Sequence, residues 1–195
     1  MRLVKSFHGS IAPGLLVGGY MVDLAVKQMG EGTLFDAISE TSSCLPDAIQ
    51  LLTPCTAGNG RLRIMDFGRF ALSLYNKESG EGVRVTLNYK SLDELGEIKT
   101  WFFRLKPKRD QDTAALRDQI IEANHDLLSL NKIVINKDFF SGGKSKGTIK
   151  ICSGCGEPYP ENEDKLCGAC KGINPYSEFN GSLIPGARQL KIAGK

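Results

Sequence analysis

The sequence predicts an α+β protein, with an N-terminal mixed or antiparallel sheet with packed helices and a small C-terminal zinc-binding module. Three observations predict this class. Two apolar segments carry a proline where a first helical turn is expected, three short runs alternate apolar and polar residues as strands do, and four cysteines have the spacing of a metal site. The 195 residues, 41% apolar and 24% charged, are ordinary for a globular chain of one or two domains.

The apolar segment 13–29 is predicted to be the first helix. Pro13 suits its first turn, and Gly30 suits the position after its end. Gly18 and Gly19 lie inside the helix, where glycine costs about 1 kcal/mol relative to alanine. Their presence therefore suggests close packing against another backbone.

A strand at residues 34–40 and a second helix at residues 45–53 are predicted next, with Pro46 in the first turn of that helix. Three alternating runs with β-branched and aromatic residues follow. They are predicted to form an antiparallel meander over residues 61–66, 69–76 and 82–89.

An amphipathic helix is predicted over residues 112–130 and a last strand over 132–139. The small, polar and glycine-rich segment 141–147 is typical of a linker. The chain is therefore expected to contain a core domain at residues 1–145 and a zinc module with its tail at residues 146–195.

The charge and cysteine content narrow the classes of partner and compartment. The formal net charge of +3 comes entirely from residues 141–195, yet the segment around the four cysteines is acidic. Phosphate binding requires the opposite sign, so nucleic acid is not an expected partner. Residues 6–22 are too interrupted by glycine and proline for a membrane helix and make a poor signal peptide. Six cysteines, four in a metal spacing, indicate a reducing compartment, the cytoplasm.

Two Cys-x2-Cys pairs lie near the C-terminus. Their spacing supplies four thiolates for a tetrahedral structural zinc, with no open position for catalysis. Gly156 follows the second cysteine, where a tight turn often requires positive φ. The predicted ligands are Cys152, Cys155, Cys167 and Cys170.

The core domain offers few reactive side chains. His8 lies in a glycine-flanked loop before a helix. Cys44 precedes the helix at 45–53, where unpaired N–H groups and the helix dipole favour a thiolate, although Asp47 opposes them. Cys55 follows the same helix, roughly 14 Å from Cys44, and this distance is too long for a disulfide between the two. Cys55 could therefore share a site with Cys44 only if a second copy of the chain supplied it. A buried small hydrophobe is the alternative for Cys44.

At these residues the chain resembles a known family. FHGSIAPGLLVGGYMV at 7–22 and SSCLPDAIQLLTPCTAGNGRLRIMDFGRFAL at 42–72 are similar to the core domain of the FmdE family of formylmethanofuran dehydrogenase proteins. The resemblance implies an α+β core, often followed by a zinc finger, and a homodimer. It also implies association with a molybdenum or tungsten oxidoreductase, whose catalytic pterin and iron–sulfur clusters belong to other subunits.

One departure from the family pattern concerns the first motif, which commonly reads His-Gly-His-x-Cys-Pro-Gly. Here Ser10 and Ala12 replace the second histidine and the cysteine, so His8, Cys44 and Cys55 remain as ligands for a second divalent metal. The resemblance predicts an accessory subunit of such an oxidoreductase. Two alternatives stay open: a stand-alone metal-binding or thiol-dependent enzyme with His8 and Cys44 as its catalytic residues, and a zinc-finger regulatory or interaction protein.

Overall fold

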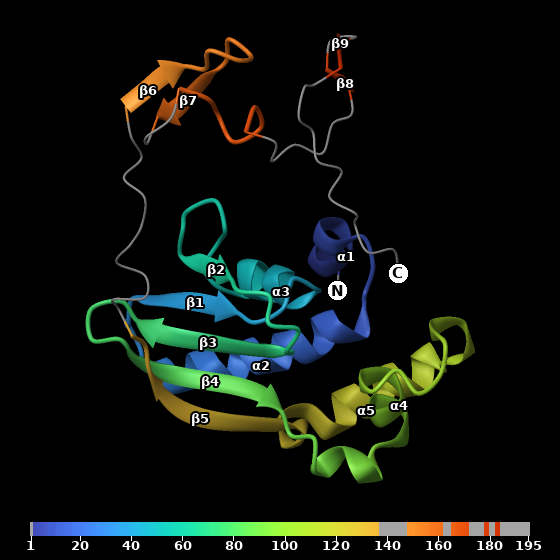
Figure 1. Ribbon diagram of the computed structural model, residues 1–195. Helices are drawn as coiled ribbons and strands as arrows, with labels where there is room; N and C mark the ends of the chain where they lie inside the picture. The colour runs from blue at the N-terminus through green and yellow to red at the C-terminus, as the bar shows by residue number, and fades with distance from the viewer. Residues whose placement is uncertain (1, 137–147, 162–164, 172–177, 180–181, 184–195) are drawn as a thin grey trace. The chain divides into compact units, whose positions relative to one another are not determined.

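The computed structural model describes residues 2–136, 148–161, 165–171, 178–179 and 182–183 (Figure 1). The chain divides into two units, Met1–Lys137 and Asp138–Lys195. The boundary expected near residue 145 lies outside the described residues.

A five-stranded mixed sheet forms the centre of the first unit, with strand order β2-β1-β3-β4-β5. Within this sheet the β1–β2 pair is parallel, and the three other pairs are antiparallel. The α+β class is therefore confirmed. The strands are β1 (Phe35–Ser39), β2 (Leu62–Ile64), β3 (Ala71–Asn76), β4 (Glu81–Leu87) and β5 (Leu128–Val134).

The predicted three-stranded meander is wrong in its first strand. β2 pairs in parallel with β1, with Ala37 opposite Leu62, whereas β3 and β4 pair antiparallel as expected. The reason is the connection between β1 and β2, which passes through a helix. Such a crossover returns the chain to the sheet in the same direction, whereas a short turn reverses it.

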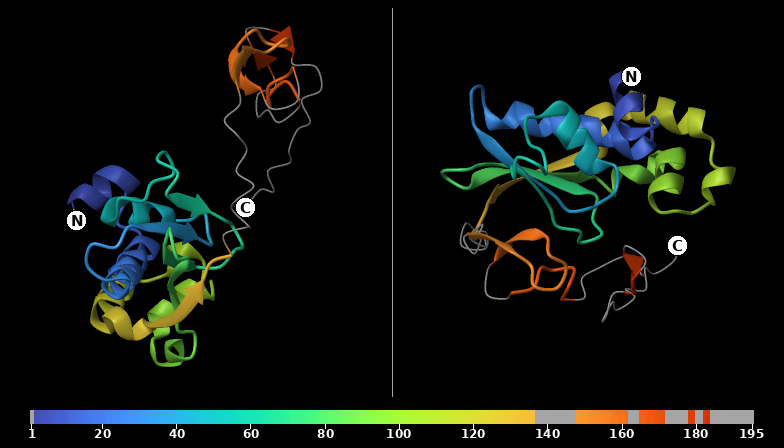
Figure 2. Two further views of the ribbon diagram at one scale, coloured as in Figure 1. Left: turned by 90° about the vertical axis from the view of Figure 1, so that its left-hand side faces the viewer. Right: turned by 90° about the horizontal axis from the view of Figure 1, so that it is seen from above.

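The helices of this unit are α1 (Arg2–His8), α2 (Pro13–Met29), α3 (Leu45–Leu52), α4 (Gly96–Phe102) and α5 (Thr113–Ala123), with single 3₁₀ turns at Ser91–Glu94, Lys108–Asp110 and Asn124–Leu127. α2 has the bounds predicted from the sequence, whereas α3 begins at the predicted residue and ends one residue before the predicted end. α2 runs along one face of the sheet beside α5 (Figures 1 and 2). Its buried face, which includes Val17, Met21 and Ala25, packs in one core with Leu72 and Val85 of the sheet.

The helix predicted over residues 112–130 is shorter than expected. α5 ends at Ala123, and Asn124 has a φ of 49°, which takes the chain out of the helix. β5 then begins at Leu128, and Leu130 lies opposite Val85 of β4. Pairing with the free edge of β4 has overridden the helical periodicity of these residues.

The second unit contains two short antiparallel pairs: β6 (Thr148–Ile151) with β7 (Pro158–Glu161), and β8 (Glu178–Phe179) with β9 (Ser182–Leu183). Among the described residues of both units, no helix combines the length and apolar character that crossing a lipid bilayer requires.

Candidate functional site

The four predicted zinc ligands come together in the second unit. One ligand atom from each of the four cysteines lies within 4.8 Å of the others, and among the described residues this is the one group of three or more His, Cys, Asp or Glu side chains so gathered. The Sγ atoms of Cys155 and Cys167 are 3.8 Å apart. Gly156 has a φ of 77°, as expected for the turn after Cys155.

The electrostatics of this cluster fit a cation. The backbone N–H groups of Cys167 and Gly154 donate to Cys152 Sγ at 3.3 and 3.4 Å, and such backbone hydrogen bonds lower the pKa of Cys152 to about 6. Burial and the neighbouring sulfur atoms raise the pKa of Cys170 to about 12. Four thiolates this close repel one another unless a cation lies between them, and four sulfur ligands suit a tetrahedral zinc ion.

In the first unit, the structure brings His8 and Cys44 together with Asp47. His8 is the last residue of α1, so the loop expected at this residue is instead the end of a helix. Its Nδ1 atom lies 2.6 Å from Asp47 Oδ2, and its Nε2 atom lies 3.8 Å from Cys44 Sγ. The three side chains therefore form a continuous chain of polar contacts from carboxylate to imidazole to thiol.

Cys44 occupies the turn between β1 and α3 in an unusual conformation. Its φ of 53° and ψ of −46° lie on the positive-φ side of the backbone map, and the Leu45 N–H donates to the Ser43 carbonyl across it. For a residue with a Cβ this is a strained backbone. The side chain is half-buried and lies against α2. The contact is with Gly14 of that helix, where an added Cβ would lie 3.2 Å from Cys44 Sγ.

The helix start does not lower the pKa of Cys44, contrary to the sequence-based expectation. Burial of the thiol, and after it the negative charge of Asp47, raise this pKa, while the positive charge of Lys108 opposes them. The helix contributes little because the Leu45 N–H already donates to Ser43 and Pro46 has no N–H. Cys44 is therefore a thiol at neutral pH.

Cys55, the third residue predicted for this site, lies elsewhere. It follows the far end of α3, its side chain is fully buried, and its Sγ atom donates to the carbonyl of Phe35 at 3.3 Å. Burial is the main cause that raises its pKa. This environment is that of a buried small hydrophobe rather than of a ligand.

Gly14, which contacts the thiol, also lies beside an aromatic pair that the sequence analysis did not identify. A Cβ on Gly14 would lie 3.6 Å from the ring of Phe70 as well as close to Cys44, and the ring of Trp101 meets that of Phe70 edge-on at 6.3 Å. Phe70 and Trp101 belong to segments distant in sequence from Cys44, so no local pattern could have indicated them. Asp47 could have been found, because it lies three residues after Cys44 on the first turn of α3.

A separate charged cluster stabilises the loop between β1 and Cys44. Glu40 is 6% exposed and receives two hydrogen bonds from Arg84, at 2.6 and 2.8 Å. Arg69 lies 2.7 Å from the same carboxylate. The hydrogen bonds from Arg84 are the main cause that lowers the pKa of Glu40. The role of this network is structural: it holds the chain just after β1, at the start of the loop that leads to Cys44.

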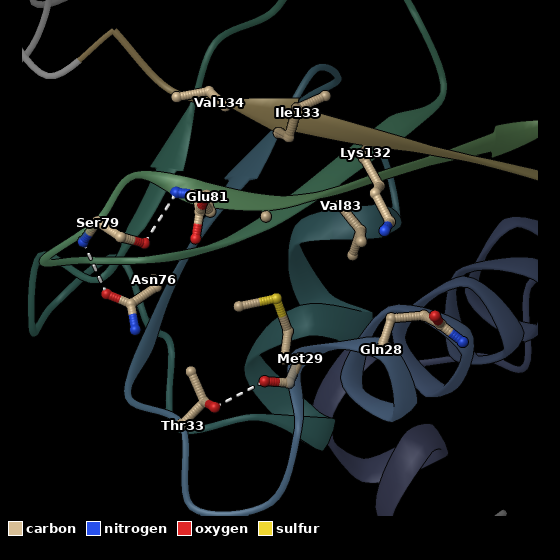
Figure 3. Close-up of a pocket in the computed structure, with 11 residues that line it drawn as sticks. Gln28, Met29, Thr33, Asn76, Ser79, Glu81, Val83, Lys132, Ile133 and Val134 are labelled. Atoms are coloured by element: carbon tan, nitrogen blue, oxygen red, sulfur yellow. Dashed lines mark hydrogen bonds between the residues drawn. The ribbon is translucent and has the colours of Figure 1, made fainter.

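A pocket of about 470 Å³ lies at the other end of the sheet (Figure 3). Three of its polar side chains are engaged in their own turns: Thr33 donates to the Met29 carbonyl, Asn76 accepts from the Ser79 N–H, and the Ser79 hydroxyl accepts from the Glu81 N–H. None of the residues predicted for a site lines it. The pocket is therefore not part of the candidate site.

Comparisons with known proteins agree with this two-part organisation. Residues 7–135 match the family model described as FmdE, molybdenum formylmethanofuran dehydrogenase operon, and residues 143–177 match the FmdE treble clef zinc finger. One similar solved structure is the crystal structure of a tungsten formylmethanofuran dehydrogenase FmdE-like protein from Syntrophus aciditrophicus. It is 47% identical, with a TM-score of 0.82, and the match covers 90% of this chain and 91% of that one.

A curated relative is more distant. It is a probable S-adenosyl-L-methionine-binding protein from Archaeoglobus fulgidus, 34% identical over 96 residues, which is 45% of this chain and 26% of the relative. The match thus spans about a quarter of the length of that relative.

Proposed function

Because this chain belongs to the FmdE family, whose model matches residues 7–135, we propose that it is an accessory subunit of an oxidoreductase of the molybdenum or tungsten formylmethanofuran dehydrogenase type. The observation that carries the proposal is this match. A separate match of residues 143–177 to the FmdE treble clef zinc finger and the similar solved FmdE-like structure support it. S-adenosylmethionine binding is not included, because the match covers only 26% of the relative so described.

The second unit has a structural role in this proposal. The four cysteines would hold one zinc ion with all four positions filled by protein, which leaves none for water or substrate. The metal would supply folding free energy to a small unit that has few buried side chains among its described residues. We place the protein in the cytoplasm, where the thiols stay reduced, and expect a homodimer.

The core domain would contribute a reactive site at His8 and Cys44. A second divalent metal there would have two protein ligands, His8 Nε2 and Cys44 Sγ, since Asp47 already contacts the other ring nitrogen and Cys55 is buried elsewhere. Catalytic zinc sites have three protein ligands. The described residues of one protomer therefore do not complete a metal site, and the contacts support a thiol site better.

The accessory role is tested by purifying the tagged full-length chain from its native host under anaerobic and gentle conditions. The expected result is co-purification of a larger redox protein, with molybdenum or tungsten in the same fraction by plasma mass spectrometry. The tag expressed alone is the control. If the chain is recovered without a redox partner in repeated purifications, the accessory role is wrong.

A further inference from the structure

We infer that Asp47, His8 and Cys44 form a carboxylate–histidine–thiol triad in which Cys44 Sγ attacks the carbonyl carbon of an acyl donor, an ester or a thioester. This inference rests on the thiol form of the site proposed above. It adds two features to that site: Asp47 as a positioning residue, and an acyl carbonyl as the group on which the thiol acts.

The contact between His8 and Asp47 determines the tautomer of the imidazole. An ionised carboxylate only accepts hydrogen bonds, so Nδ1, at 2.6 Å from Asp47 Oδ2, carries the proton and donates it. Nε2 then has a free lone pair, and it is this nitrogen that lies 3.8 Å from Cys44 Sγ. The orientation is the one in which a histidine acts as general base toward a nucleophile while a carboxylate holds the ring.

The backbone position of Cys44 is an independent observation. The residue lies at a sharp turn from a strand into a helix, with positive φ. Strained strand-to-helix turns of this kind present the nucleophile of many acyl-transfer enzymes, and such strain is found mainly where it serves a function. The side chains of His8 and Asp47 are 19% and 33% exposed, so the site is shielded but within reach of a small molecule.

The chemistry can be written with atoms and electrons balanced. As Cys44 Sγ forms a bond to the carbonyl carbon, its proton passes to His8 Nε2. The bond from that carbon to the leaving oxygen or sulfur then breaks, and the leaving group takes the proton from Nε2. Water, with His8 as base, hydrolyses the Cys44 thioester to a carboxylic acid and restores the thiol. Burial raises the pKa of Cys44, so the thiol is protonated at neutral pH. It therefore requires His8 as the base that removes its proton during attack.

The first test uses the reduced full-length chain and p-nitrophenyl acetate, an aromatic ester chosen because Gly14, which contacts the thiol, also lies beside the ring of Phe70. We expect a burst of about one p-nitrophenolate per chain and one acetyl group on Cys44 by peptide mass spectrometry. Cys44→Ala should abolish the burst, and His8→Asn should slow it by about a hundredfold, at the lower end for loss of a general base. A wild-type chain without acetyl on Cys44, or a burst that survives Cys44→Ala, overturns the inference.

The structure offers matched controls for this test. His125 Nε2 lies 2.8 Å from Asp23 Oδ2, a second histidine–carboxylate pair, and Cys55 is a second core thiol, which donates to a backbone carbonyl. His125→Asn and Cys55→Ala should leave the acetylation rate within about twofold of the wild type. A loss as large as that of His8→Asn in the His125 variant would show that the effect is not specific to the triad, and would count against it.

The positioning role of Asp47 has a readout of its own. Asp47→Asn can donate to Nδ1 and so move the ring proton to Nε2, which then cannot accept the thiol proton. We expect acetylation to slow by about tenfold or more and the ¹⁵N resonances of the His8 ring to show the other tautomer. Asp47→Glu should keep the wild-type tautomer and recover part of the rate. Unchanged rate and tautomer in Asp47→Asn would refute the role.

The outcomes separate this inference from the accessory role. A failed co-purification leaves the acetylation result standing, and an absent acetylation leaves the accessory role standing. A metal ion bound at Cys44 in the purified chain would overturn the triad.

Discussion

Gly18 of α2 and Ala48 of α3 lie so close together that a Cβ built on Gly18 would sit 2.9 Å from the Cβ of Ala48. This contact brings the two helices together just after Gly14 and Cys44, which are themselves in contact. The position of the thiol therefore depends on a glycine one turn further along α2.

Replacing Gly18 should destabilise the core domain. Gly18→Val adds a branched side chain where even one Cβ is too close, and overpacking of this kind costs about 1–3 kcal/mol. Gly19→Ala is the matched control, because its Cβ would make only an ordinary contact of 3.8 Å with Leu52. This control should raise the free energy of unfolding by up to about 1 kcal/mol. Urea unfolding measures both, and equal effects would contradict the packing argument.

Glu40 should make the stability of the core depend on pH. Its pKa is lowered below the ordinary 4.5 by Arg84, so its contribution is complete above that pH and is lost as the pH falls through the folded-state pKa. Glu40→Gln breaks a buried pair and should lower the free energy of unfolding by about 3 kcal/mol at neutral pH. In this variant the free energy of unfolding should also fall less steeply as the pH is lowered.

The control for Glu40 is Asp93→Asn, which removes an exposed ion pair with Lys99. Exposed pairs contribute little, so this variant should unfold much like the wild type at neutral pH and keep its decline in acid. If Glu40→Gln shows the same decline as the wild type, another carboxylate is responsible.

Gly154 should be required for metal binding by the second unit. A Cβ on this residue would lie 2.9 Å from Cys170 Sγ, so Gly154→Ala should displace a ligand and weaken zinc affinity by about tenfold or more. Gly168→Ala is the matched control, since nothing lies within 4 Å of its Cβ. Competition with a colorimetric chelator measures both affinities. Comparable affinities for the two variants would argue against the geometry described.

The metal content should be one zinc per chain, in the wild type and in Cys44→Ala alike. Cys152→Ala should lose that zinc, because three thiolates remain of a four-ligand set. Plasma mass spectrometry on the three proteins measures the zinc content per chain. Two metals in the wild type that fall to one in Cys44→Ala would instead place an ion at Cys44.

Much of the fold follows from local patterns. Pro13 and Pro46 marked the starts of α2 and α3 because a fixed φ suits the first turn of any helix. The close packing expected from Gly18 and Gly19 is confirmed at Gly18, which lies against Ala48, but not at Gly19, where an added Cβ would make only an ordinary contact. Local patterns failed where pairing was not local: the parallel direction of β2 depends on a crossover, and β5 begins within an apparently helical segment because β4 offers a free edge.

The sequence by itself determined the four-cysteine site, because the spacing of two Cys-x2-Cys pairs is that of four thiolates that bind one metal ion. It also indicated His8 and Cys44, one by one, as reactive side chains. Only the tertiary structure decided that Asp47 holds the ring of His8 and that Cys55 is buried elsewhere. The reason is distance along the chain: His8 and Asp47 are 39 residues apart, and their contact exists only after α1 packs on α3.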